Sequence, residues 1–190
     1  MFFSVIAACS GSDRPEVETL DFSVDSTLLG ESFADSAAGL FLKVPAGWRR
    51  LSEATVKQVQ TSIEVVSGDT ELPVPWILAL FSLQEHNAHL VVGRYDPRLL
   101  PADRNSLLIW QKEELEGQFP ESEVSFARFK HNGILFEQLL VAGAEFTVIK
   151  LFIRCEGRGI YQFEYVASRS WYEANLQSIE SSIGSITFGS

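Results

Sequence analysis

Hydrophobic positions after residue 39 fall into short runs that are separated by polar turn residues. Runs of this length, rich in branched and aromatic side chains, are typical of β-strands. The predicted strands are residues 40–48, 76–83, 90–95, 124–130, 134–142, 146–155 and 160–168, followed by a short last strand at the sequence SITF. The later runs are joined by the short sequences HNG, AGAE and EGRG. Such short joins predict antiparallel neighbours, because parallel strands need a long crossover.

Three further segments have the spacing of amphipathic helices. In residues 52–66, Ser52 can cap the first turn and Val56, Val59, Ile63 and Val66 recur every three or four positions. A second helix is expected to start near Asp103 or Asn105 and to end near Gly117, and a third spans residues 171–183. The order of strands and helices predicts an α+β domain in which helices pack on an antiparallel meander sheet.

The first residues differ from this domain. Phe2 to Ala8 is a short apolar run, and it ends in the sequence IAAC at Cys9. This sequence resembles the bacterial lipoprotein box, in which the cysteine sulfur receives a diacylglycerol and the chain is cut before the cysteine. The resemblance implies that Cys9 is a lipidation site and that residues 1–8 are the remnant of a signal peptide. Because Met1 is followed directly by Phe2 and not by a basic residue, the true start is hypothesised to lie upstream. The alternative is an ordinary hydrophobic N-terminus that packs into the fold.

Residues 9–38 are predicted to form an acidic tether between the bilayer and the domain of residues 39–190. Residues 1–38 contain seven acidic side chains and one basic side chain, and such one-sided charge favours an extended, solvated chain. A competing interpretation is a first strand, because Leu20, Phe22 and Val24 alternate with polar residues. Part of residues 19–29 is therefore expected to dock on the domain.

Charge and cysteine content exclude several partners. The chain has 15 basic and 25 acidic residues, for a formal net charge of −10. This balance argues against nucleic acid, whose binding depends on Lys and Arg, and against charge-driven binding to an anionic membrane. The two cysteines, Cys9 and Cys155, could pair only if the tail folded back, and Cys155 is expected to be a small buried residue.

Two segments resemble the PsbP/DcrB-like superfamily. They are LFLKVPAGW at residues 40–48 and WYEANLQSIESSIGSITF at residues 171–188. The order of strands and helices resembles the superfamily over residues 39–190, whereas the sequence motifs resemble it only in these two segments. The resemblance implies an antiparallel sheet with helices on both faces, an α/β/α sandwich. Many bacterial members are lipoproteins, and the family has no shared catalytic residues to carry over.

Candidate chemical groups are few. His86 and His89, beside Glu85, have a His-x-x-His spacing, but a solvated hairpin turn is the preferred interpretation because a third metal ligand is not identified. Arg94 and Asp96 complete the only polar set that is close in sequence. No catalytic residue, no metal site and no cofactor is therefore predicted. The tryptophans Trp48, Trp76, Trp110 and Trp171 lie near element ends, where they either close the core or line a groove for a partner.

These observations predict a lipid-anchored protein of the bacterial cell envelope, with the periplasmic side of the outer membrane favoured by Ser10 after the cysteine. Its domain is expected to be non-catalytic and to bind a protein partner or act in assembly. The alternative is a carrier or chaperone for hydrophobic ligands or segments, which requires an apolar concavity. An enzyme would need titratable groups that converge in a pocket.

Overall fold

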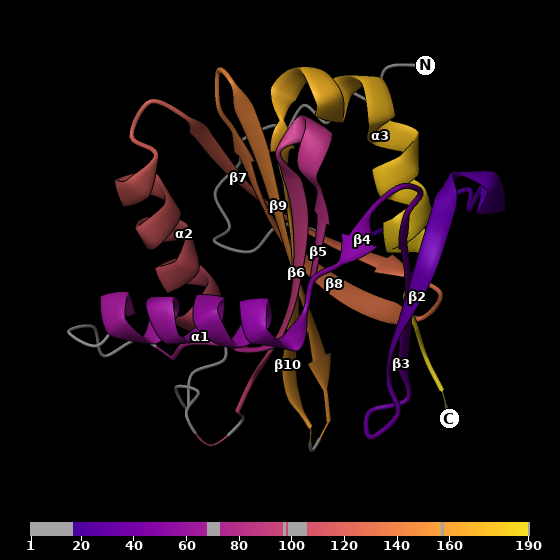
Figure 1. Ribbon diagram of the computed structural model, residues 1–190, viewed down its shortest axis with the longest axis horizontal. Coiled ribbons are helices and arrows are strands. Elements are labelled where there is room, and N and C mark those ends of the chain that lie inside the picture. Colours follow the sequence, from indigo (N-terminus) through magenta and orange to yellow (C-terminus); the bar gives the residue numbers. More distant parts are fainter. Residues whose placement is uncertain (1–16, 68–72, 97, 99–105, 157, 190) are drawn as a thin grey trace.

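The computed structural model describes residues 17–67, 73–96, 98, 106–156 and 158–189 (Figure 1). Its larger sheet has eight strands in the order β1-β7-β8-β9-β10-β6-β5-β4. The bounds are β1 (Val17–Thr19), β7 (Glu123–His131), β8 (Ile134–Ala142), β9 (Phe146–Cys155), β10 (Gly159–Ser168), β6 (Ala88–Tyr95), β5 (Trp76–Leu83) and β4 (Arg49–Arg50).

The predicted meander is confirmed. Strands β7, β8, β9 and β10 pair antiparallel in chain order, and β6 and β5 continue the sheet beyond β10. The turn between β7 and β8 has positive φ at both Asn132 (50°) and Gly133 (78°). Two such residues in a two-residue loop match the twist of antiparallel strands, which explains how the sequence HNG encodes this hairpin.

A smaller sheet of three strands was not predicted. It contains β11 (Thr187–Phe188), β3 (Leu40–Pro45) and β2 (Leu29–Asp35), in that order, and all its pairs are antiparallel. This sheet and α3 (Arg169–Gly184) lie on one side of the large sheet, whereas α1 (Glu53–Ser67) and α2 (Ser106–Gln118) lie on the other (Figure 1). The predicted α+β sandwich with helices on both faces is confirmed. The predicted caps of α2, Asp103 and Asn105, lie outside the described residues.

Each face of the large sheet has its own apolar core. On the α3 side, Leu151 and Phe163 belong to a cluster that also contains residues of β3 and α3. On the α2 side, Phe152 and Ile160 pack with Leu107 and other residues of α2. Because successive side chains of a strand point to opposite faces, β9 and β10 are buried on both sides.

The structure changes the predicted boundary between tether and domain. Residues 29–35 form β2, and residues 17–28, here called the N-terminal strap, lie against the domain. Leu20 and Phe22 pack against the core of the α3 side, which is the docking that their alternation with polar residues indicated. The acidic side chains of this region did not prevent docking, because Glu18 and Asp21 remain exposed to solvent.

Contacts with α3 and β7 hold the strap in place. The Ser181 hydroxyl accepts from the Asp25 backbone N–H at 3.1 Å, and the Leu20 N–H donates to the Lys130 carbonyl at 2.9 Å. The buried His131 ring lies between two carbonyl oxygens, 3.0 Å from Leu20 through Nδ1 and 3.2 Å from Gly184 through Nε2. These contacts join the strap, the end of β7 and the end of α3.

Candidate binding groove

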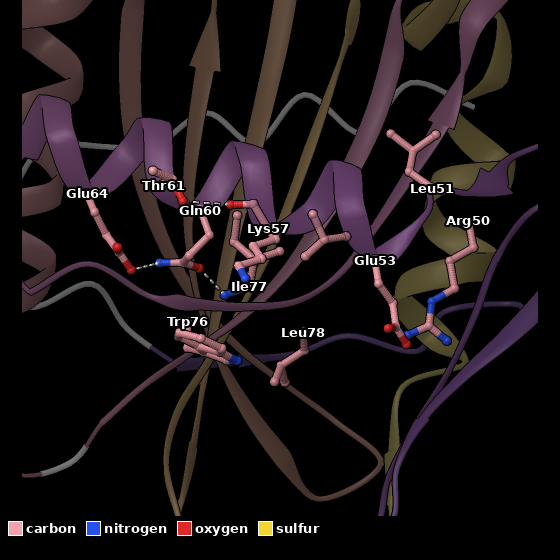
Figure 2. A pocket seen from close by; sticks show the side chains of 11 residues that line it. Arg50, Leu51, Glu53, Lys57, Gln60, Thr61, Glu64, Trp76, Ile77 and Leu78 are labelled. Atoms are coloured by element: carbon pink, nitrogen blue, oxygen red, sulfur yellow. Dashed lines mark hydrogen bonds between the residues drawn. The ribbon is translucent and has the colours of Figure 1, made fainter.

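A groove of about 550 Å³ lies between α1 and the outer edge of β5 (Figure 2). Its lining combines apolar side chains with side chains of both charges. The lining residues are Arg50, Leu51, Glu53, Val56, Lys57, Gln60, Thr61, Glu64, Trp76, Ile77 and Leu78. A concave site that combines apolar surface with a few polar groups is the usual form of a binding site in proteins.

Helix α1 forms one wall of the groove. The local sequence determines both where this helix starts and which of its residues share the face that lines the groove. The Ser52 hydroxyl accepts from the Thr55 N–H at 3.2 Å, which satisfies one of the free donors of the first turn. Residues 56, 57, 60, 61 and 64 then recur every three or four positions, so they line one face of the helix. The helix predicted for residues 52–66 is confirmed.

Gln60 connects this wall to the strand. Its side chain is almost fully buried, at 7% exposure. The Oε1 atom accepts from the Ile77 backbone N–H at 2.8 Å, and the Nε2 group donates to Glu64 at 2.9 Å (Figure 2). A backbone N–H at a sheet edge normally donates to a neighbouring strand or to water. Sequence reasoning did not find Gln60, because a polar residue within an amphipathic helix has no distinctive pattern.

Trp76 is the most exposed tryptophan whose surroundings the structure describes. Its exposed fraction is 61%, whereas Trp48 is 3% exposed and packs between Tyr165 and Trp171 at centroid distances of 6.3 and 5.7 Å. Trp110 and Trp171 are half-buried. Both predicted uses of tryptophan therefore occur: Trp48 closes the core, and Trp76 lies at a groove.

Gly93 permits the backbone of residues 75 and 76 to pass close to β6. A Cβ atom at Gly93 would lie 3.0 Å from the Pro75 Cβ and 3.5 Å from the Trp76 carbonyl oxygen. Larger residues at position 93 would therefore push this segment outward.

Charged side chains also line the groove. Arg50 lies over the Phe33 ring at 5.8 Å, and Lys57 extends toward the groove from the middle of α1 (Figure 2). Neither cation has an ion pair among the residues that the structure describes. Glu53 lies on the first turn of α1, and a Glu64 oxygen accepts from Gln60.

The structure separates the residues of the His-x-x-His pattern. His86 is exposed in a short 3-10 turn and its ring lies 6.3 Å from that of Trp171. His89 is half-buried on β6, where burial lowers its pKa and the nearby charge of Glu164 partly opposes that shift. Within the described ranges, no group of three or more His, Cys, Asp or Glu side chains could hold a metal ion.

The polar residues at the other end of β6 do not join them. Arg94 lies 3.7 Å from Asp35, and the Tyr161 hydroxyl donates to Asp35 at 2.7 Å. Burial, and then this hydrogen bond, raise the pKa of Tyr161 to about 12. Asp96 accepts from the side chain and backbone of Arg98, which lowers its pKa to about 2. The candidate polar set is thus divided between the two ends of a strand.

The cysteines can be placed only in part. Cys9 lies outside the described residues. Cys155 is a free thiol at the end of β9, partly buried against the core, and burial raises its pKa to about 11. Among the described helices, none is long and apolar enough to cross a bilayer.

Comparison with known proteins identifies the fold. No protein-family model matches the chain, and no curated protein sequence matches it. The chain is similar to the solution structure of cyanobacterial PsbP (CyanoP) from Synechocystis sp. PCC 6803, with a TM-score of 0.52 and 12% sequence identity. The match covers 97% of this chain and 99% of that one. The fold is PsbP-like, which confirms the resemblance at the level of the fold.

Proposed function

We propose that this protein is a lipoprotein of the bacterial cell envelope whose PsbP-like domain binds a protein partner without catalysing a reaction. The anchor would be Cys9, at the end of the sequence IAAC. Each buried methylene contributes about 0.8 kcal/mol to membrane binding, so a diacylated cysteine is held stably whereas a single chain is not. Attachment at residue 9 leaves the described domain in the aqueous phase, on the periplasmic side of the outer membrane.

The observation that carries protein binding is the exposed Trp76 at the groove. Soluble proteins usually bury most of a tryptophan, and tryptophan is enriched among the residues that dominate binding energy in protein interfaces. Here a large aromatic surface lies beside Leu78 and below the polar face of α1 (Figure 2). Apolar surface with a charged rim is the usual composition of a protein interface.

A non-catalytic domain is favoured by the positions of the candidate polar residues. Glu85 and His86 precede β6, whereas Arg94 and Asp96 are at its far end. General acid–base or nucleophilic catalysis needs such groups within hydrogen-bond reach of a common substrate. The fold itself is not an argument here, because one fold can host many functions.

The alternative, a carrier for hydrophobic ligands, is less well supported. A carrier needs an enclosed apolar cavity of the kind that buries most of a ligand. Both faces of the large sheet are instead filled by packed side chains of two core clusters. The groove lies at the sheet edge and has Arg50, Glu53, Lys57 and Glu64 around it, which suits a protein surface better than a lipid chain.

Capture of partners from detergent-solubilised membranes tests this function. The full chain, Trp76→Ala and Val65→Ala would be expressed at native level. Val65 is a matched control, because it is 76% exposed on α1, which forms one wall of the groove, but does not itself line the groove. We expect one partner to be retained by the full chain and by Val65→Ala and to be lost with Trp76→Ala. A chain that always elutes alone contradicts protein binding.

The anchor has its own test. Intact-mass analysis of membrane-extracted protein is expected to give a chain that begins at Cys9 and carries the mass of a diacylglycerol. An unmodified Cys9 contradicts the anchor and leaves the groove untouched.

A further inference from the structure

The outer edge of β5 is covered by a strand over only part of its length. Strand β4 pairs with Phe81 and Ser82, and the Leu51 N–H then donates to the Leu80 carbonyl at 2.8 Å. At Glu53 the chain enters α1, and the described residues supply no further strand beside residues 76–79. The groove lies at this part of the edge, where α1 and not a strand lies beside β5.

Gln60 occupies the place that a neighbouring strand would fill. Its side-chain oxygen accepts from the Ile77 N–H at 2.8 Å, as the backbone carbonyl of a paired strand would. Natural proteins protect sheet edges from unwanted pairing by covering them with helices or side chains. Gln60 meets the edge through its side chain alone, so releasing the Ile77 N–H breaks no backbone hydrogen bond of α1.

The cations beside this edge define the chemistry of a segment that could pair there. Arg50 and Lys57 line the groove and have no ion pair among the described residues, although the chain as a whole has a net charge of −10. The lining also holds two carboxylates, Glu53 and Glu64, and Glu64 accepts from Gln60. Among the described residues neither acid forms an ion pair with Arg50 or Lys57, so a carboxylate on an incoming segment could pair with either cation directly.

We propose that an extended acidic segment of the partner protein adds to the edge of β5 in line with β4. The segment takes the Ile77 N–H from Gln60, places carboxylates near Arg50 and Lys57, and packs an apolar side chain on Trp76. Backbone pairing supplies affinity, and the side-chain contacts supply specificity. This inference rests on the proposed function and gives its mode of recognition.

Two peptides of opposite charge probe this edge directly. They are acetyl-Val-Glu-Val-Glu-Val-Glu-amide and the same sequence with lysine in place of glutamate. Each is titrated into the ¹⁵N-labelled full chain while the Ile77 amide signal is followed. We expect the acidic peptide to shift that signal and to bind at least about threefold more tightly than the basic one, as expected for exposed charge pairs.

Two variants distinguish strand pairing at β5 from nonspecific binding of the peptides. Lys57→Glu is expected to remove or reverse the preference for the acidic peptide. Gln60→Met removes the competing oxygen at nearly constant size, so it is expected to tighten peptide binding by about threefold or more. If Gln60 were merely structural, Gln60→Met would lower the thermal midpoint without raising peptide affinity. Val65→Ala is expected to match the unmodified chain in every respect.

Equal binding of both peptides, or an unchanged Ile77 signal at saturation, overturns strand addition. If partner capture still depends on Trp76 in that case, protein binding at the groove stands and only its mode is wrong. If capture is also independent of Trp76, both proposals fall.

Discussion

The two edges of the large sheet are closed in different ways. At one edge, the nine residues of β7 are covered by the three residues of β1 and by the N-terminal strap. Phe22 packs there on Phe129 and His131 at centroid distances of 5.6 and 5.1 Å. At the other edge, β4 covers two residues of β5, and Gln60 covers Ile77 with one hydrogen bond.

This difference shows at which edge the covering residues can be displaced with the smaller loss of free energy. Releasing the strap would expose aromatic side chains and free several backbone groups together, which is expensive in water. Moving Gln60 breaks one hydrogen bond to Ile77, and an incoming strand would replace it. Our proposal therefore places the partner at the β5 edge.

The largest loss of stability is expected at alkaline pH. It should affect both edges of the sheet equally, because the tyrosines that cause it lie on the central strands β6 and β10. Burial raises the pKa of Tyr95, Tyr161 and Tyr165, to about 12 for Tyr161. A raised pKa means that the folded state binds the proton more tightly, so this contribution is complete below the unfolded value near pH 10 and is lost as the pH rises through about 12. Urea unfolding at pH 9, 10 and 11 measures the decline.

The control for this effect is Tyr161→Phe, which should flatten the decline above pH 10. Equal slopes for the two chains would contradict the role given to the buried phenol.

Gly184→Ala tests the edge that the strap closes. A Cβ atom at Gly184 would lie 2.8 Å from the Phe22 Cβ and 2.9 Å from a Val24 methyl, so the strap must move. We expect a loss of about 1–3 kcal/mol in the free energy of unfolding, as for overpacked sites. Hydrogen exchange should quicken in residues 17–25 first.

Gly117→Ala is the matched control, because no atom lies within 4 Å of a Cβ built at this position in α2. It should stabilise the protein by about 0.5–1 kcal/mol, since alanine is the better helix residue. The same sign for both variants would contradict close packing of the strap on α3.

Gln60→Met tests the other edge. It leaves the Ile77 N–H without its acceptor, and an unsatisfied buried donor costs about 1–3 kcal/mol. Partial access of water to the groove should keep the loss near the lower value. Chemical denaturation gives the free energy, and the Ile77 amide should exchange faster while the Leu20 amide does not. Equal acceleration at both amides would mean that the edges are not independent.

Trp76→Ala should have the smallest effect on stability, within about 0.5 kcal/mol, because most of the side chain is already exposed. Its effect on partner capture should nevertheless be the largest of any single change in the groove. A large drop in thermal midpoint would show that the indole supports the fold instead of serving an interface.

Most of the central sheet could be predicted because its signals are local. The runs at residues 76–83, 134–142 and 146–155 coincide with β5, β8 and β9, and the turn residues between them encode short antiparallel joins. Helix α1 follows from apolar spacing and the Ser52 cap in the same way. Hydrophobic period and turn chemistry are sufficient where neighbours in sequence are also neighbours in space.

Docking of part of residues 19–29 could be predicted from the alternation of Leu20, Phe22 and Val24, but the contacts that close the edges could not, because they join distant parts of the chain. Asp25 and Ser181, which hold the strap on α3, are 156 positions apart. Strand β2 has a single fully buried side chain, Phe33, so it has no clear alternation. Gln60 serves Ile77 across 17 positions by a hydrogen bond that no periodicity marks. The groove therefore emerges only once α1 and β5 are placed together.

Amide hydrogen exchange at both edges, in the free protein and in the complex with the captured partner, tests the central claim most directly. The account predicts that the Ile77 amide becomes strongly protected in the complex while the Leu20 amide keeps its rate. Protection that rises at Leu20 and not at Ile77 would place the partner at the wrong edge and contradict the account.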